Sequence, residues 1–137
     1  MNLKFKVLNG GKLPTRAHRE DAGFDLYSPI SVVLCGGTTR IKLGVCVEIP
    51  KGCVGFIMGR SSLSKKGIAC LTGVIDSGYT GEIAVVLNDV DTCVIIKKGD
   101  RIAQLVVAKL ADIDDTVAVD SLEDSERGAG GFGSTGT

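Results

Sequence analysis

Apolar and polar residues alternate along most of this chain with a period of two, as they do in strands that bury one face. In RIKLGVCVEIP (40–50) the apolar positions are Ile41, Leu43, Val45, Val47 and Ile49. Similar strand-like runs are FKVL (5–8), ISVVL (30–34), CVGFIM (53–58), IAVVL (83–87), CVIIK (93–97), RIAQLVV (101–107) and TVAV (116–119). The pattern therefore predicts many short strands and no long helix.

Turn-forming residues divide these runs at short intervals. The chain contains nineteen glycines and three prolines, and its one helix candidate is SSLSKKG (61–67), which Gly67 closes. Many short strands joined by turns are typical of an all-β sandwich, jelly roll or barrel. We therefore predict an all-β fold with one short helix.

The C-terminal part of the chain has a different composition. From Asp112 the sequence is acidic and polar, and it ends in RGAGGFGSTGT (127–137). Glycine at this density weakens strands and opposes a packed core. We therefore predict one β domain over residues 1–120 and a flexible arm over residues 121–137.

Charge and hydropathy exclude several classes of function. Sixteen basic and sixteen acidic residues give a formal net charge of zero, which favours neither nucleic acid nor a membrane surface as a partner. A local basic site can still hold a phosphorylated small molecule. The N-terminal apolar run is too short for a signal peptide, and no stretch is long enough to span a bilayer. We expect a cytoplasmic protein.

The five cysteines show neither paired nor metal-ligand spacing. Their number is odd, no pair has C-x-x-C spacing, and most lie inside apolar runs. We therefore expect buried, reduced thiols that act as small apolar side chains, and neither a disulfide scaffold nor a zinc site.

The segment MGRSSLSKKG offers groups that bind phosphate. Arg60 places a guanidinium beside the hydroxyls of Ser61 and Ser62. A solvated arginine followed by a serine cap is an equally simple interpretation.

Two glycine motifs in the tail lack the context that they need. GAGGFG (128–133) matches the dinucleotide fingerprint, and GAGGFGST (128–135) nearly matches the P-loop, with Ser134 in place of its lysine. Both motifs require a following helix, and this sequence ends at Thr137. Free backbone N–H groups can still wrap a polyphosphate, with Arg127 adding charge and Phe132 a stacking face.

Acidic residues in three segments are candidates for chemistry. Asp25, in EDAGFDLYSP, suits a hydrated Mg2+, although a turn aspartate is the simpler interpretation. In GVIDSGYTGEI (73–83), Asp76 suits a general base and Tyr79 a sugar platform. The alternative there is a plain turn in which Gly78 takes a positive φ. Arg101 and Gln104 suggest only a solvated strand.

In combination these segments resemble the five ordered motifs of the homotrimeric dUTPase family. The matching segments are AGFDL, GRSSLSKKG, GVIDSGYTGEI, GDRIAQLV and RGAGGFGSTG. The resemblance implies a jelly-roll fold, a homotrimer with shared active sites, and Mg2+-dependent hydrolysis of dUTP to dUMP and pyrophosphate.

The resemblance also implies a role for each matched residue. Asp76 would be the general base and Gln104 would help to place the water, while Asp25 would hold Mg2+ through water. Substrate contacts would come from Arg60, Ser61, Ser62, Gly73, Val74, Ile75, Tyr79, Ala84, Arg127, Phe132, Gly133, Ser134 and Thr135. Tyr79 would exclude a 2′-hydroxyl, the backbone from Gly73 to Ala84 would read uracil, and the arm would close as a lid.

Two other functions remain open at this stage. A dCTP deaminase shares the fold, but it needs a glutamate base where this hairpin presents Asp76 and Tyr79. The second alternative is a non-catalytic trimeric β module that binds nucleotides or a protein partner. The presence of Asp25, Asp76, Arg127 and Phe132 together argues against it. Gly59, Ser62, Ser64, Cys70 and Gly78 depart from the commonest family pattern, which weakens the finer uracil contacts.

Overall fold

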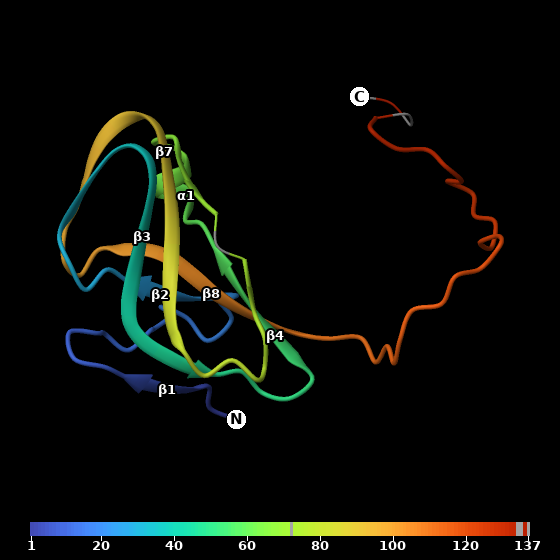
Figure 1. Ribbon diagram of the computed structural model, residues 1–137, viewed down its shortest axis with the longest axis horizontal. Coiled ribbons are helices and arrows are strands. Elements are labelled where there is room, and N and C mark those ends of the chain that lie inside the picture. The colour runs from blue at the N-terminus through green and yellow to red at the C-terminus, as the bar shows by residue number, and fades with distance from the viewer. Residues whose placement is uncertain (72, 134–135, 137) are drawn as a thin grey trace.

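The chain folds into two antiparallel sheets. The computed structural model describes residues 1–71, 73–133 and 136. Over these residues the sheets have the strand orders β1-β3-β7-β5 and β2-β8-β4-β6 (Figure 1). The elements are β1 (Lys4–Val7), β2 (Gly23–Tyr27), β3 (Val32–Glu48), β4 (Cys53–Met58), α1 (Ser61–Ser64), β5 (Ile68–Cys70), β6 (Val74–Ile75), β7 (Glu82–Ile96) and β8 (Arg101–Lys109). The predicted all-β fold with one short helix is confirmed.

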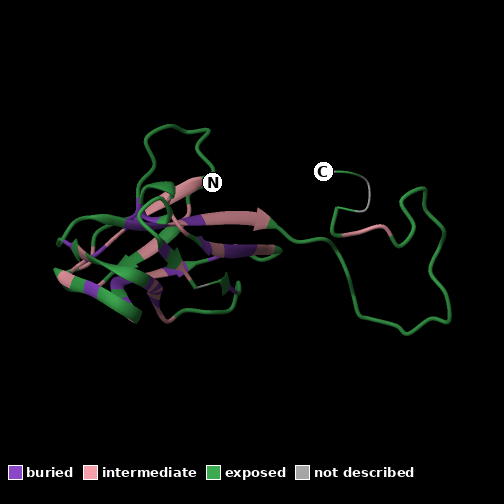
Figure 2. Cartoon of the chain, turned by 90° about the horizontal axis from the view of Figure 1, so that it is seen from above, coloured by how far each residue is buried: buried purple, intermediate pink, exposed green. Residues whose placement is uncertain are grey.

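The core lies between the two sheets and follows the predicted alternation. Ile41, Leu43 and Val45 of β3 are each 1% exposed, and they pack in one cluster with Ile57 and Leu105 of the opposite sheet. In Figure 2 the buried positions alternate with exposed ones along the strands. Burial of this apolar face is what holds the two layers together.

Two strands are much longer than the sequence pattern suggests. The runs 30–34 and 40–50 belong largely to one 17-residue strand, β3, and the runs 83–87 and 93–97 to the 15-residue strand β7. β3 pairs with β7 on both sides of a bulge at Gly36 and Gly37, whose φ angles are +77° and +74°. The glycines between the runs form a bulge here and not a turn.

The predicted strand TVAV (116–119) is wrong. Residues 116–119 have no strand structure and are exposed. Alternation alone does not make a strand, because a strand needs a partner that pairs with its backbone and covers its apolar face. No strand in the described part of this chain pairs with these residues.

The expectation of five buried, reduced cysteines is also wrong. Cys35 of β3 and Cys93 of β7 are joined by a disulfide, and both residues are exposed. The strand register brings them together, with 4.3 Å between the Cα atoms, although they are 58 residues apart in sequence. Cys46, Cys53 and Cys70 are free and half-buried.

Asp89 of β7 is a buried carboxylate at the end of an apolar row. It is 2% exposed and accepts hydrogen bonds from the Gly36 N–H at 3.3 Å, the Thr92 N–H at 3.1 Å and the Thr92 hydroxyl at 3.0 Å. Burial raises the pKa of Asp89, but these hydrogen bonds favour the charged form and leave the pKa below its ordinary value. Asp89 therefore links the β3 bulge to the middle of β7.

The chain leaves the sheets after β8. Residues 110–133 are exposed apart from Gly130 and Gly131, and Figures 1 and 2 show them extending away from both sheets. The boundary between a domain and a flexible arm at residues 120 and 121 stays a prediction. No helix in the described ranges is long and apolar enough to cross a membrane.

Candidate functional site

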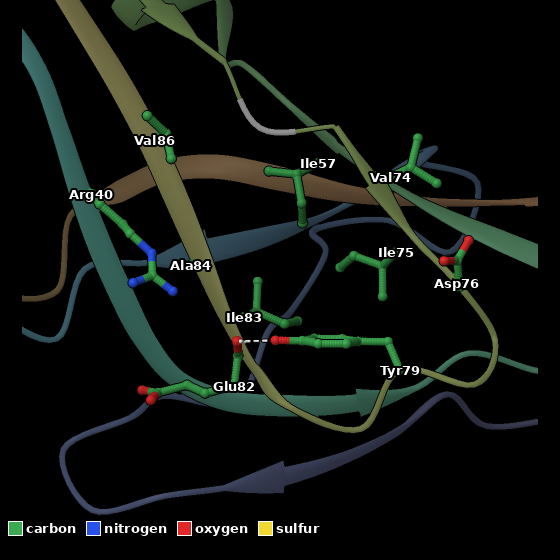
Figure 3. A pocket seen from close by; sticks show the side chains of 10 residues that line it. All are labelled: Arg40, Ile57, Val74, Ile75, Asp76, Tyr79, Glu82, Ile83, Ala84 and Val86. Carbon is green, nitrogen blue, oxygen red and sulfur yellow. Dashed lines mark hydrogen bonds between the residues drawn. The ribbon is translucent and has the colours of Figure 1, made fainter.

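The hairpin formed by β6 and the start of β7 encloses the first of two cavities that contain predicted site residues. This hairpin cavity has a volume of about 280 Å³ and is lined by Arg40, Ile57, Val74, Ile75, Asp76, Tyr79, Glu82, Ile83, Ala84 and Val86 (Figure 3). Ile57, Ile75 and Ile83 belong to the core and give the cavity an apolar floor. Arg40 and Asp76 stand on opposite sides of it in Figure 3.

The two strands beside this cavity do not pair with each other. Among the described residues β6 pairs with β4 alone, and residues 82–85 of β7 pair with β3 on their other edge. Among the described residues, no backbone hydrogen bond joins β6 to residues 82–85. Two strand edges therefore face a slot in which backbone N–H and C=O groups can bond to the edge of a planar ligand.

The turn between the strands holds Tyr79 across the cavity. The Tyr79 N–H donates to the Asp76 carbonyl at 3.0 Å, and the Tyr79 hydroxyl donates to the Glu82 carbonyl at 3.0 Å (Figure 3). Gly81 is required for this closeness, since a Cβ there would lie 2.5 Å from the Tyr79 hydroxyl oxygen. The positive φ at Gly78 that belonged to the plain-turn alternative is not observed, because Gly78 is absent from the glycines with a left-handed backbone.

The second cavity is polar and lies where β2, β8 and the start of α1 meet. This charged cavity has a volume of about 420 Å³ and is lined by Arg16, Ala17, Asp21, Ala22, Gly23, Asp25, Arg60, Ser61, Arg101 and Gln104. Strand register builds it, because Asp25 of β2 and Met58 of β4 are both paired with Gln104 of β8. Arg60 and Ser61 follow β4 directly and lie at the start of α1.

Asp25 is the electrostatic centre of the charged cavity. Its Oδ1 lies 3.4 Å from Arg60 Nε, and its Oδ2 lies 3.4 Å from Arg101 Nη1. The side chains of Asp25 and Arg60 are 21% and 24% exposed, so both are largely shielded from water. One carboxylate between two guanidinium groups leaves a net positive charge, which suits a polyanionic ligand.

Gln104 is held by the backbone around it. Its Nε2 donates to the Gly59 carbonyl at 3.0 Å. A Cβ at Gly23 would collide with the Gln104 amide oxygen, so glycine at this position leaves room for the side chain. Gln104 therefore presents a fixed amide to the same cavity as Asp25 and Ser61.

The predicted site residues divide into separate groups within one chain. Val74, Ile75, Asp76, Tyr79 and Ala84 line the hairpin cavity. Asp25, Arg60, Ser61 and Gln104 line the charged cavity. The two predicted catalytic residues, Asp76 and Gln104, are thus not brought together.

Four further predicted residues lie apart from both groups. The Gly73 carbonyl accepts a hydrogen bond from the Ile57 N–H at 2.8 Å, which links the segment before β6 to β4. Ser62 faces a neighbouring cavity of about 230 Å³ that Arg60 and Lys66 also line. In the C-terminal segment Phe132 is fully exposed, and Arg127 Nε donates to the Gly130 carbonyl at 2.7 Å.

The predicted roles of the residues at the end of the arm stay predictions. Gly133 is exposed, with a φ of +81°. Ser134 and Thr135, which were expected to close on the phosphates, lie outside the described residues.

The residues around Asp25 fit a hydrated magnesium ion. The described part of the chain contains no cluster of three or more His, Cys, Asp or Glu side chains that could hold a metal ion alone. Mg2+ commonly keeps several waters and takes one or two carboxylates plus substrate phosphates. A single carboxylate beside Arg60 and Ser61 in a cavity of about 420 Å³ matches that requirement.

Several charged residues that line the two cavities had no predicted role. Arg101 and Arg16 line the charged cavity, and Arg40 and Glu82 line the hairpin cavity. Arg101 was taken as a solvated strand residue, because alternation shows which face a residue lies on but not which carboxylate it meets. No local pattern distinguishes the other three from surface charges.

Comparisons with known proteins agree on one family. The dUTPase family model matches residues 9–136. The deoxyuridine 5′-triphosphate nucleotidohydrolase of Saccharomyces cerevisiae is 44% identical over 127 residues, which cover 90% of this chain and 86% of the yeast protein.

Solved structures show the same similarity. The dUTPase of Staphylococcus bacteriophage 80alpha, in complex with dUPNHPP, aligns with a TM-score of 0.90 at 32% identity and covers 99% of both chains. A variant dUTPase of phage phi11 of S. aureus, described with a structural Mg(II) ion, aligns with a TM-score of 0.82 at 27% identity, over 90% of this chain and 100% of that one.

Proposed function

This chain belongs to the dUTPase family, and we propose that it hydrolyses dUTP to dUMP and pyrophosphate by attack of water on the α-phosphate. The reaction would lower dUTP and supply dUMP for dTTP synthesis. The observation that carries the proposal is the unpaired slot of the hairpin cavity, with Asp76 at the end of β6 beside it.

The slot suits a uracil base. Backbone N–H and C=O groups on two facing edges can pair with the carbonyl and N–H groups of a pyrimidine edge, and the apolar floor can pack against the ring. Tyr79, held by Glu82 and allowed by Gly81, provides a flat face for the deoxyribose, where a 2′-hydroxyl would collide with the ring. This arrangement favours deoxyuridine over uridine.

The charged cavity suits the triphosphate. Arg60 offers a planar guanidinium and Ser61 a hydroxyl, with Ser61 assigned to the oxygen between the α- and β-phosphorus atoms. Asp25 would hold a hydrated Mg2+, which would supply positive charge to neutralise the charge that develops on the phosphates. The phage phi11 relative described with a structural Mg(II) ion supports the use of this metal.

The chemical step requires groups from both cavities. Asp76 would take a proton from water and aim it at the α-phosphorus, and the Gln104 amide would help to hold that water or the α-phosphate. Phosphoryl transfer depends mainly on positioning and charge neutralisation, so no covalent intermediate is needed.

The separation of Asp76 from Gln104 supports a homotrimer with shared sites. Within one chain the two residues line different cavities. A second copy that brings its charged cavity against the hairpin cavity of the first would unite them. In this arrangement Arg127 would meet the γ-phosphate, and Phe132 would stack on uracil as the arm closes.

The test is release of pyrophosphate from dUTP, compared with dTTP, dCTP and UTP, with and without Mg2+. We expect rapid release from dUTP alone, and only in the presence of Mg2+. No release from dUTP would end the proposal. Release of ammonia from dCTP would identify a deaminase instead.

A further inference from the structure

Arg101 makes a contact that the proposed reaction does not yet use. Its Nη1 lies 3.4 Å from Asp25 Oδ2, while its backbone carbonyl accepts a hydrogen bond from Arg60 Nη1 at 3.2 Å. Arg60 in turn lies 3.4 Å from the other oxygen, Asp25 Oδ1. Three residues from β2, β8 and the start of α1 therefore form a closed ring of polar contacts, which the Arg101 backbone carbonyl completes.

We propose that Arg101 is the positioning residue of the metal-binding carboxylate. Arg60 would turn from Asp25 to the phosphates when the substrate binds. Arg101 would keep its contact with Oδ2 of Asp25, so that the released Oδ1 could accept hydrogen bonds from the waters of the metal. This inference rests on the proposed function, since it assigns a new role within the same site.

The backbone of Arg101 is the more firmly fixed of the two arginines. Arg101 is paired with Tyr27 in the sheet, and the preceding Asp100 accepts hydrogen bonds from the Ser28 N–H at 2.8 Å and, through its side chain, from the Lys97 N–H at 2.8 Å. Arg60 lies in the connection between β4 and α1, with an extended backbone and no capping bond from its own side chain. We therefore assign the movement to Arg60, whose backbone lies outside the sheets, and the fixed position to Arg101, whose backbone is paired within a sheet.

The charges support the same division of roles between Arg60 and Arg101. While Arg60 and Arg101 both hold Asp25, each oxygen of the carboxylate faces a guanidinium cation, which repels a hydrated metal cation. A triphosphate competes for Arg60, because bidentate guanidinium–phosphate contacts are strong. Release of Oδ1 by Arg60 gives the metal its carboxylate, and Arg101 prevents that carboxylate from rotating.

The experiment measures the affinity of the protein for Mn2+, which takes the place of Mg2+. Full-length protein is saturated with dUPNHPP, and free Mn2+ is followed by electron paramagnetic resonance for the wild type, R101K and R101Q. When a residue that hydrogen-bonds to a metal-binding side chain is lost, metal affinity typically falls about 10- to 100-fold. We expect a loss of this size in R101Q. R101K, which keeps the charge, should lie between R101Q and the wild type. The affinity of R101Q for dUPNHPP in EDTA should stay within about 3-fold of the wild type.

R16Q is the matched control. Arg16 lines the same cavity, but it stacks on Phe24 at 4.8 Å and donates to the Asp21 carbonyl at 3.2 Å, with no contact to Asp25. R16Q therefore removes the same charge from the cavity and should leave Mn2+ affinity unchanged.

Each contrary outcome has a distinct meaning. Equal losses in R16Q and R101Q would show an effect of charge and overturn the positioning role. If R101Q also lost affinity for dUPNHPP in EDTA, Arg101 would be a phosphate ligand, and the positioning role would be overturned. Mn2+ affinity in R101Q equal to that of the wild type would overturn it as well. A wild-type protein that fails to bind dUPNHPP contradicts the proposed function itself. Thermal melting establishes that each variant is folded, and Arg101 is 52% exposed, so R101K and R101Q should melt near the wild type.

Discussion

The two cavities of this chain are built on opposite principles. The hairpin cavity exists because two strand edges do not pair, so its recognition groups are backbone atoms above an apolar floor. The charged cavity exists because paired strands bring Asp25, Arg101 and Gln104 into register, so its recognition groups are side chains that bind one another. One cavity is suited to a base and the other to its phosphates, and a substitution in either should affect only one half of the substrate.

The largest effect should come from D76N. Loss of general-base help should lower kcat by about 100- to 10,000-fold, while the Kd for dUPNHPP stays unchanged, because asparagine keeps the size and polarity of the side chain. Steady-state pyrophosphate release and calorimetric titration measure the two quantities. D91N is the control, since Asp91 is exposed and lines neither cavity. A tenfold loss of dUPNHPP affinity in D76N would place Asp76 in binding and not in chemistry.

Deletion of residues 127–137 should have the next largest effect. The described part of this segment makes only local hydrogen bonds, such as that from the Gly128 N–H to the Ser125 carbonyl at 3.0 Å, so the melting temperature should barely change. Loss of a charge-assisted contact from Arg127 and of base stacking by Phe132 should lower kcat/KM about 100- to 1,000-fold. A large drop in melting temperature would show that the segment supports the fold and is no lid.

R60Q should separate the two halves of the substrate. Loss of the guanidinium should raise KM for dUTP and the Kd for pyrophosphate by about 10- to 100-fold, since hydrogen bonds to charged groups contribute about 1.5–3 kcal/mol. Binding of deoxyuridine, which uses only the hairpin cavity, should not change. Equal weakening of deoxyuridine and pyrophosphate would mean that the cavities are not independent.

The smallest effect on catalysis should come from D89N, which changes neither cavity. Because the folded-state pKa of Asp89 lies below its ordinary value of 3.8, the charged carboxylate stabilises the fold above that pH. This stabilisation is lost as the pH falls through the lowered folded-state pKa. D89N should therefore melt at a lower temperature than the wild type at pH 7, and the difference should shrink below about pH 3.8. A melting difference that is independent of pH would assign the effect to packing.

Local patterns predicted the parts of this protein that depend on neighbouring residues. Alternation identified the buried face of β3. The resemblance of GVIDSGYTGEI to a family motif selected Asp76 and Tyr79, and both line a cavity. The pattern failed where pairing decides the outcome. TVAV alternates but has no partner strand among the described residues, and Cys35 meets Cys93 only through the register of β3 and β7.

The sequence by itself determined the class of fold and the family, and it supplied most of the candidate site residues, because these follow from side-chain type, order and spacing along the chain. Tertiary structure alone decided that Asp76 and Gln104 line different cavities, and that Arg101 shares Asp25 with Arg60. The reason is physical: which strand edges pair, and which charges meet across a sheet, depends on contacts between residues that are far apart in sequence.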